Sequence, residues 1–335
     1  MSPVQRRLRI PGEWERHEAC WIAFPYLEDE WLGNLGSAQA AVAELCRAIA
    51  GPGDERVRLL VKDEALEERA RAAIGDSARV DYLRADYGDC WMRDTAPLLG
   101  HMPSGALGAL CFEFNGWGGK YPMPFDDRVS RWLTDRLDAE RFECPVVLEG
   151  GALESNGEGT FLTTDSCVLN PNRNPRLTRE AFERELDARV SIKRLIWFDR
   201  GLEHDHTDGH VDMIARFVAV DAAICMRPDE NAPNGAVLEA IRSELRANGL
   251  IVLELPAPRA ISAPDGSPLP ASYCNFYVAN EAVVVPTYGI PEDRAALAEI
   301  ANAFAGREVI GVPARDLLWG GGAFHCVTQP QPSEP

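Results

Sequence analysis

The feature that most constrains the fold of this 335-residue chain is a loose repeat with a period near 60 residues. Polar residues able to take part in chemistry open successive blocks, at Asp94, Glu149, His210, Cys274 and Cys326. Subtracting successive positions gives spacings of 55, 61, 64 and 52 residues, and each block combines strand patterns with one helix pattern. Such repetition is typical of radial architectures, in which each unit turns one edge toward a common axis. An ordinary α/β sandwich, whose loops also recur at intervals, is the alternative.

Helix and strand patterns alternate along the chain, which favours an α/β fold. One helix is expected from Ser37, as its N-cap, to the Gly-Pro-Gly at 51–53, and Asp63 is expected to cap the next. Polar turns at 220–221, 280–281 and 156–157 each predict a hairpin. Further helices are expected over residues 127–138, 178–189, 235–248 and 292–304. No low-complexity linker interrupts the sequence, so residues 1–335 are expected to form one domain.

The formal net charge of −18 argues against nucleic acid and anionic membranes as partners, because both are bound chiefly by Lys and Arg. It is compatible with a cationic small molecule, although acidity also serves solubility. The first residues lack the apolar core of a signal peptide, and no apolar run approaches the ~18 residues of a membrane span. Nine cysteines without a metal-like CxxC pair therefore indicate reduced thiols and a cytoplasmic location.

One cysteine differs from the others in its surroundings. Cys326 follows three glycines in "WGGGAFHCVTQ" and precedes polar residues instead of an apolar run. Glycines let a ligand approach the backbone closely, and a thiolate in such a place could act as a nucleophile. Cys90 adjoins a charged motif. Six others are interpreted as buried structural thiols: Cys20, Cys46, Cys111, Cys167, Cys225 and Cys274. Of these, Cys111, Cys167 and Cys225 stand in runs that resemble strands.

The segment "HDHTDGHVD" holds three of the six histidines and allows three interpretations. His204, His206 and Asp208 resemble the HxHxDH run of metallo-hydrolases, although the third histidine comes one residue late. Alternatively, a strand starts at His210, so that His210 and Asp212 point to the same side and project a base and a carboxylate into one cleft. The third interpretation is a polar loop that is merely rich in histidine.

Three further stretches carry groups suited to a site, and each also has a plain structural interpretation. In "DCWMRDTAPLL", Asp94 lies beside Arg93 and near Trp91, which also fits a surface salt bridge. In "LEGGALE", Glu149 precedes a glycine pair, which also fits a turn. The stretch "FNGWGGKY", with Trp117 at its centre, is a glycine-rich aromatic loop that covers a ligand or crosses the core.

Seven stretches, taken in order, make the sequence resemble the agmatine deiminases, guanidine-modifying enzymes grouped with the Porphyromonas-type peptidylarginine deiminases. They are "ERHEACWIAFP", "CWMRDTAP", "FNGWGG", "LEGG…GEGTFLTTDSCVLNPNRNP", "DGHVDMIARFV", "ASYCNFYVANEAVVVPTYG" and "GGGAFHCVTQPQP". The resemblance runs nearly end to end. It implies a five-bladed pseudosymmetric α/β propeller of ββαβ units around a polar axial site, which agrees with the repeat.

The resemblance also implies roles for individual residues. Cys326 of GGG-x-x-HC matches the nucleophile, and His210 of GHxD matches the general acid and base. Asp94 and Asp212 match the carboxylates that hold the guanidinium, and Glu149 of LEGG matches the residue that supports the histidine. Three more residues complete the expected substrate-binding set: Trp91, Trp117 and Asp208. No metal or redox cofactor is implied.

Three positions depart from the family pattern. Ala96 stands where relatives often have glycine, and Ala323 stands where they often have asparagine. His206 stands where many relatives have an acid. The change at Ala323 removes a side chain that could form a hydrogen bond near the nucleophile, and the change at His206 bears on recognition of the substrate's distal amine.

The implied function is hydrolysis of agmatine to N-carbamoylputrescine and ammonia through a covalent thiouronium on Cys326, a step of putrescine and polyamine biosynthesis. A guanidinium is always charged and its carbon is a poor electrophile, so two carboxylates and a thiolate suit this reaction. The partner is then a small cationic guanidine, and a homo-oligomer is compatible with the sequence. The alternatives are a deiminase or amidinotransferase acting on another guanidine, a metal-dependent hydrolase using His204, His206 and His210, and a non-catalytic propeller.

Overall fold

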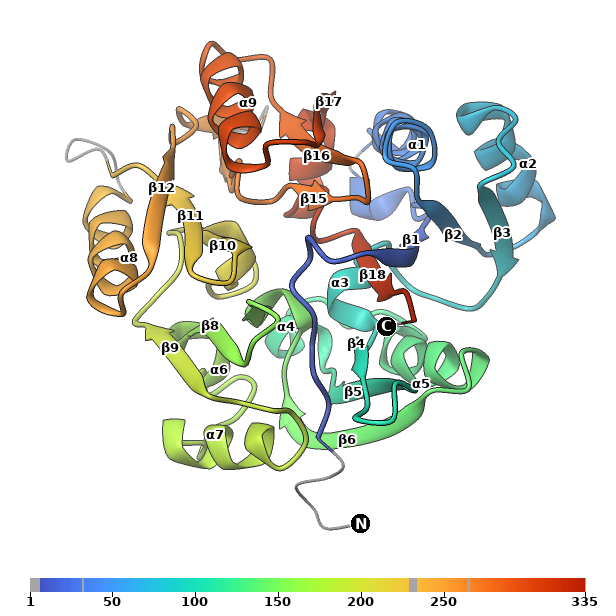
Figure 1. Ribbon diagram of the computed structural model, residues 1–335. Coiled ribbons are helices and arrows are strands. Elements are labelled where there is room, and N and C mark those ends of the chain that lie inside the picture. The colour runs from blue at the N-terminus through green and yellow to red at the C-terminus, as the bar shows by residue number, and fades with distance from the viewer. Residues whose placement is uncertain (1–6, 32, 229–233, 264–265, 335) are drawn as a thin grey trace.

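The computed structural model describes residues 7–31, 33–228, 234–263 and 266–334. Within them, five sheets of three or four strands are arranged around a common centre, and the longer helices lie on the outer side (Figure 1). The sheets are hydrogen-bonded separately, so the described residues form no single closed sheet.

The strand bounds follow the chain. The first sheet contains β18 (Thr328–Pro332), β1 (His17–Ala23), β2 (Arg56–Val61) and β3 (Val80–Arg84). The second sheet contains β4 (Leu98–His101), β5 (Leu107–Glu113) and β6 (Glu140–Val147), and the third contains β7 (Glu154–Ser155), β8 (Thr160–Thr164) and β9 (Arg194–Phe198). The fourth contains β10 (Ala215–Ala219), β11 (Ala222–Met226) and β12 (Ile251–Leu255). The fifth contains β15 (Tyr277–Val278), β16 (Ala282–Thr287) and β17 (Glu308–Pro313). A separate two-stranded ribbon is formed by β13 (Ile261–Ser262) and β14 (Pro268–Leu269).

The helices fall into long outer ones and short turns. The long helices are α1 (Leu35–Ala50), α2 (Glu64–Ile74), α5 (Asp126–Arg136), α7 (Arg179–Asp187), α8 (Gly235–Ala247) and α9 (Glu292–Ala303). The short ones are η2 (Asp29–Trp31), α3 (Met92–Thr95), α4 (Gly116–Gly119), η3 (Gly150–Ala152), α6 (Asp165–Val168), η4 (Val211–Met213) and η5 (Arg315–Gly320).

All five sheets share one pairing pattern. In β4-β5-β6, the first two strands are antiparallel and the last two are parallel, with α5 between them in sequence. Parallel neighbours need a crossover connection, and a helix supplies it in each sheet. The first sheet differs because its antiparallel strand is β18, which pairs with β1 from the other end of the sequence. The predicted recurrence of strands with one helix is therefore present in the structure.

Side-chain caps begin two of the long helices, α2 and α7. The carboxylate of Asp63 accepts a hydrogen bond from the backbone N–H of Leu66 and so caps α2, as expected. Thr178 caps α7 in the same way through the N–H of Ala181. The expected N-cap at Ser37 is wrong, because α1 begins at Leu35 and Ser37 lies inside it. Leu35 is buried, so packing extends the helix beyond its polar start signal.

Two expected strand positions are also wrong. Residues 211–213, expected as the start of a hairpin strand, form the 3-10 turn η4, and β10 begins only at Ala215. His210 and Asp212 therefore do not share a strand face. Cys167, placed by its apolar neighbours in a strand, lies in the short helix α6.

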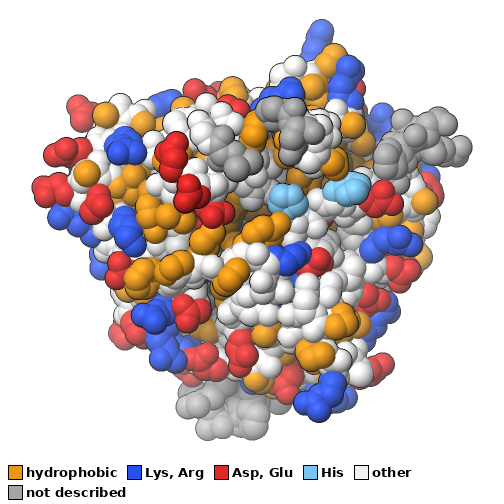
Figure 2. Space-filling view, turned by 180° about the vertical axis from the view of Figure 1, so that it is seen from behind, with side chains coloured by type: hydrophobic (Ala, Val, Ile, Leu, Met, Phe, Trp, Pro, Cys, Tyr) orange, Lys and Arg blue, Asp and Glu red, His pale blue; other side chains and the backbone are white. Residues whose placement is uncertain are grey.

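The surface fits a charged globular protein. On the face in Figure 2, acidic and basic side chains are mixed around the rim, whereas hydrophobic side chains gather near the centre beside histidine side chains. No helix in the described ranges is long and apolar enough to cross a membrane.

Candidate active site

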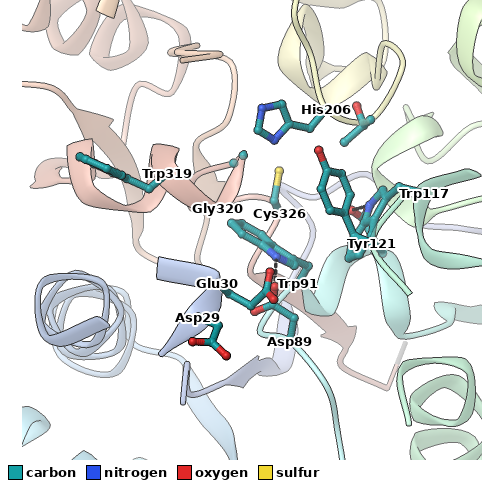
Figure 3. A pocket seen from close by; sticks show the side chains of 14 residues that line it. Asp29, Glu30, Asp89, Trp91, Trp117, Tyr121, His206, Trp319, Gly320 and Cys326 are labelled. Carbon is teal, nitrogen blue, oxygen red and sulfur yellow. Dashed lines mark hydrogen bonds between the residues drawn. The ribbon is translucent and has the colours of Figure 1, made fainter. Parts of the chain in front are cut away.

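A pocket opens beside Cys326, which lies between η5 and the start of β18 (Figure 3). Aromatic and acidic side chains from loops and short helices surround it, and glycine backbone forms one wall. The lining residues are Asp29, Glu30, Asp89, Trp91, Asp94, Trp117, Tyr121, His206, Thr207, Trp319, Gly320, Gly321, Gly322 and Cys326. Of the predicted site residues, Cys326, Asp94, Trp91 and Trp117 thus line the pocket directly.

The thiol of Cys326 is held by Asn275, a residue that the sequence did not single out. The side-chain nitrogen of Asn275 donates to Sγ at 3.1 Å. Its oxygen accepts the backbone N–H of His325 at 3.1 Å and that of Cys326 at 3.3 Å. The neighbouring Cys274, expected to open this block, points elsewhere and donates to the carbonyl of Ile214. The block boundary was therefore placed correctly, but the functional side chain is the next one along.

The electrostatic surroundings of Cys326 keep the thiol protonated at rest. Its Sγ lies 3.7 Å from an oxygen of Asp212. Burial raises the pKa of the thiol well above its usual value, and the charges of Asp212 and Asp94 raise it further. The backbone N–H of Ala323 acts in the opposite direction, and it does so whatever side chain stands there. The departure at Ala323 thus leaves that donor in place.

His210 is fully buried and sits against Glu149. Nε2 of His210 lies 3.1 Å from Oε2 of Glu149, and Nε of Arg173 contacts both Glu149 oxygens at 2.9 Å. Burial alone would lower the pKa of His210, but attraction to Asp94 and the hydrogen bond to Glu149 raise it well above its usual value. For Glu149, burial would raise the pKa, but His210 and Arg173 lower it. The pair is therefore an imidazolium held by a carboxylate.

Asp94, His210 and Asp212 converge on Gly151 from three separate segments. A Cβ added at Gly151 would stand 2.6 Å from Nδ1 of His210, 2.9 Å from Oδ1 of Asp94 and 3.1 Å from Oδ2 of Asp212. Any side chain at this second glycine of LEGG would fill the space between the three groups. The residues that the sequence grouped are thus close together in the structure, although η4 and not a strand presents Asp212, with His210 directly before it.

Two polar atoms of this group have no partner. Nδ1 of His210 and Oδ1 of Asp212 are buried without a hydrogen bond, which is costly unless a ligand or water completes them. Asp94 is better supported: Trp117 Nε1 donates to Oδ2 at 2.9 Å and the Gly151 N–H donates to Oδ1 at 3.0 Å. Burial nevertheless raises the pKa of Asp94 to about 6. Oδ1 of Asp212 is therefore free to accept a hydrogen bond from a cationic ligand, whereas Nδ1 of His210 is free to donate one.

Comparison with known proteins gives this geometry a family context. The family model described as "Porphyromonas-type peptidyl-arginine deiminase" matches residues 9–332. The chain belongs to the Porphyromonas-type peptidyl-arginine deiminase family. The agmatine deiminase of Stutzerimonas stutzeri is 34% identical over 362 residues, which cover 99% of this chain and 97% of that protein.

Solved structures show the same similarity in three dimensions. The agmatine deiminase of Enterococcus faecalis superposes with a TM-score of 0.90 at 27% identity, over 99% of this chain and 97% of that one. A substrate-bound agmatine deiminase of C. jejuni gives a TM-score of 0.90 at 28% identity, over 98% and 97% of the two chains. The family resemblance read from the seven motifs is thereby confirmed.

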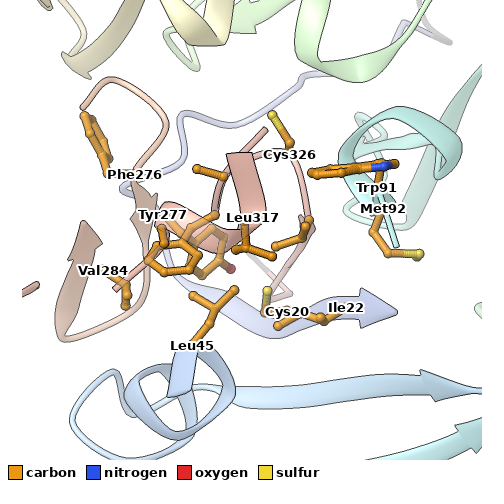
Figure 4. Close-up of a cluster of buried hydrophobic side chains, with 14 of the residues drawn as sticks. Cys20, Ile22, Leu45, Trp91, Met92, Phe276, Tyr277, Val284, Leu317 and Cys326 are labelled. Carbon is orange, nitrogen blue, oxygen red and sulfur yellow. The ribbon is translucent and has the colours of Figure 1, made fainter. Parts of the chain in front are cut away.

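The glycine run of this family member makes room for aromatic rings. A Cβ on Gly320 would lie 2.6 Å from Trp91 and 3.0 Å from Trp31, and one on Gly322 would lie 2.8 Å from Trp91. Trp91 in turn stacks on Trp31 and lies at the edge of the buried core beside Cys326 (Figure 4). Cys326 itself precedes β18 and is not part of a strand. The bare backbone therefore lets the Trp91 ring approach the thiol.

Asp208 does not take the place expected for it. Its carboxylate contacts Arg173 at 2.6 Å, Lys120 at 2.8 Å and Asn172 at 2.9 Å, and it is not among the residues that line the pocket. These contacts lower its pKa although burial acts to raise it. Asp208 thus ties the aromatic loop around Trp117 to the segment before His210, and it also contacts Arg173, which binds Glu149.

The metal-hydrolase alternative required His204, His206 and His210 to share a site. The structure keeps them apart: His206 stacks on Tyr121 at the pocket, and His204 lines a separate hollow. In the described residues one other group has ligand spacing, Glu149, Cys167 and His210, with ligand atoms within 4.8 Å of one another. There the Arg173 guanidinium already contacts both Glu149 oxygens at 2.9 Å, where a metal ion would be repelled.

Prolonged dialysis against a strong chelator should leave guanidine hydrolysis by this protein unchanged. The reason is that the three histidines do not converge and that Arg173 neutralises the remaining group. Activity before and after dialysis is the measurement, with elemental analysis for zinc as the control. A loss of activity that added zinc restores would contradict this expectation and favour the metal-hydrolase alternative.

Proposed function

We propose that the protein is an agmatine deiminase, which hydrolyses agmatine to N-carbamoylputrescine and ammonia in putrescine and polyamine formation. The observation that carries the proposal is the convergence of His210, Asp94 and Asp212 on the space beside Gly151, with the Cys326 thiol 3.7 Å from Asp212. The family and the names of its full-length relatives support the same reaction.

The two carboxylates would hold the substrate's guanidinium. A guanidinium is planar and carries N–H donors along its edges, so acceptors on two sides fix its plane. Asp212 offers its unpartnered Oδ1, and Asp94 offers oxygens already oriented by Trp117 and Gly151. The thiol of Cys326, next to Asp212, then faces the guanidinium carbon.

Binding of the cation would also prepare the nucleophile. The negative charges of Asp94 and Asp212 raise the pKa of Cys326 in the empty site. A guanidinium between these carboxylates offsets their charge, so the thiol can release its proton to solvent and become a thiolate. The resting site therefore holds a protected thiol that is activated by the substrate itself.

The chemical steps follow from these states. The thiolate sulfur bonds to the guanidinium carbon, His210 donates its proton to the leaving nitrogen, the C–N bond breaks and ammonia departs. A thiouronium remains on Cys326. Neutral His210 then accepts a proton from water, whose oxygen attacks the carbon, and cleavage of the C–S bond releases the ureido product. In amidino transfer, a second amine would replace water in this last step.

The proposal extends to the architecture. The shared antiparallel-then-parallel pattern and the arrangement of the five sheets around one centre support a five-bladed α/β propeller of ββαβ units, formed by residues 1–335 as one domain. In that architecture, Asp94, Glu149 and His210 come from the inner ends of neighbouring blades. Self-association and a cytoplasmic location stay predictions of the sequence.

The far wall of the pocket favours a second positive charge on the substrate. Asp29, Glu30 and Asp89 line it, and no Lys or Arg is among the pocket-lining residues of the described chain (Figure 3). The guanidinium groups of Arg93 and Arg216, outside the pocket lining, are taken by Glu13 at 2.8 and 2.9 Å. An arginine α-carboxylate would therefore meet acidic groups without a cation to receive it.

Agmatine should accordingly be hydrolysed with kcat/KM at least ~100-fold above that for free arginine, the equivalent of about 2.7 kcal/mol. The two compounds share the guanidinium and the aliphatic stem and differ in one carboxylate at the distal end. A colorimetric ureido assay on both substrates measures the ratio, and product analysis in the presence of an added amine distinguishes hydrolysis from transfer. Comparable values, or a preference for arginine, would contradict agmatine as the substrate.

A further inference from the structure

Asp212 is joined to a buried chain of charged groups that runs away from the pocket. Its Oδ2 lies 2.7 Å from Nδ1 of His325, and Nε2 of the same ring lies 2.9 Å from Oε2 of Glu13. Glu13 is further bound by Arg93 at 2.8 Å and by Arg216 at 2.9 Å. His325 and Glu13 were not singled out in the sequence, and neither is among the pocket-lining residues.

The hydrogen-bond chemistry defines the state of the His325 ring. Ionised carboxylates only accept hydrogen bonds, so a ring that lies between two of them must donate from both nitrogens. Both carboxylates are ionised, although burial would raise their pKa values. Arg216 and His325 lower the pKa of Glu13. His325 and His210 lower the pKa of Asp212. His325 is therefore an imidazolium, even though the ring is almost completely buried.

The two oxygens of Asp212 therefore have different surroundings. Oδ2 is occupied by His325, whereas Oδ1 is buried and has no partner. A carboxylate pinned at one oxygen can turn little, so the direction of the free oxygen is set by the ring that holds the other. Asn275, which binds the backbone of both His325 and Cys326, fixes this ring relative to the nucleophile.

We propose that His325 is a positioning residue that fixes the carboxylate of Asp212, whose Oδ1 is left free for the substrate's guanidinium, and that His325 is itself held by Glu13. The proposal rests on the proposed function, because it specifies how that site is held ready for a cation. His325 touches neither the substrate nor the reacting atoms in this arrangement, and it acts only through Asp212.

Two variants separate this role from a merely structural one. The side-chain nitrogen of Asn branches from Cγ, as Nδ1 of His does, whereas that of Gln stands one atom further out, near the position of Nε2. His325→Asn therefore keeps a donor to Asp212, and His325→Gln keeps one to Glu13. Losing a hydrogen bond to a charged group costs about 10- to 100-fold, so His325→Gln should lower kcat/KM for agmatine by that factor. His325→Asn should retain most of the wild-type kcat/KM for agmatine.

A second readout is the acid side of the pH profile. Asp212 faces His325, His210, Arg216, Cys326 and Asp94. Loss of the imidazolium charge in either variant raises the pKa of Asp212, so kcat/KM should begin to fall at a higher pH than in the wild type. His17→Asn is the matched control, because His17 is also a buried histidine beside a glutamate, Glu55 at 3.2 Å, but lies outside the pocket.

Each outcome decides one question. A wild type without activity on agmatine would overturn the proposed function itself. With an active wild type, greater loss in His325→Gln than in His325→Asn, together with the shifted profile, supports the positioning role. Equal kcat/KM in the two variants at equal thermal stability, or an acid limb that stays in place, would overturn this inference alone.

Discussion

Replacing Cys326 by alanine should abolish hydrolysis of agmatine while leaving the fold and the binding of agmatine intact. The thiol supplies the only sulfur that lines the pocket in the described residues, and the covalent route has no other nucleophile. In the proposed site, Asp94 and Asp212 bind the guanidinium, and this substitution leaves both in place. Turnover is measured with the ureido assay, and agmatine binding to the variant is measured by calorimetry.

Cys274→Ala provides a matched control for Cys326→Ala. This cysteine is equally buried and lies beside Asn275, but its thiol donates to the Ile214 carbonyl, away from the pocket. It should keep most of the activity. Substantial turnover by Cys326→Ala would rule out the covalent mechanism, whereas loss in both variants would point to packing around Asn275.

Asp94→Asn and Asp212→Asn should each lose activity by about a hundredfold to a few thousandfold. Removing one partner of a desolvated charge pair costs roughly 3–5 kcal/mol, because the remaining charge stays buried without compensation. An amide is nearly the same size as the carboxylate, so the packing around Gly151 is kept. kcat and KM are determined for both variants, with the melting temperature as a check on folding.

Asp293→Asn is the control for these two substitutions. Its carboxylate accepts hydrogen bonds from the Tyr273 hydroxyl at 2.6 Å and from the backbone of Tyr288, and it is not among the pocket-lining residues. It should change stability and leave kcat/KM unaltered. Kinetics close to the wild type for both Asp94→Asn and Asp212→Asn would show that these carboxylates do not hold the substrate.

Local features of the fold were predictable because their causes are local. Asp63 and Thr178 cap the helices that follow them through bonds to residues three positions on. The turn at 211–213 could not be predicted, because the apolar pattern of the segment fits a strand equally well. The hydrogen bond from the Ile214 N–H to the Val211 carbonyl, at 3.0 Å, shows the tighter turn only once the chain is folded.

The motif residues of the candidate site could be predicted from the sequence, but the residues that contact and hold them could not. Cys326, His210 and the two aspartates stand in short recognisable stretches. Glu13 lies 312 positions from His325 in the sequence, and nothing in its own neighbourhood marks it as a partner. Cys167 was interpreted as inert, yet its thiol donates to Glu149 at 3.7 Å. Such contacts depend on which segments the sheets bring together, and a single sequence does not specify that.

The pairing of β18 with β1 has a consequence for how activity arises during folding. The side chains of Trp21 and Gln331, which bond at 3.0 Å across this pair, are 310 positions apart in the sequence. Contacts of such separation carry the greatest loop-closure entropy and form slowly. Cys326 lies just before β18, and His325 reaches back to Glu13, just before β1. Catalytic competence is therefore a late event on the folding pathway, and a collapsed chain that has not yet made this closure carries no working nucleophile.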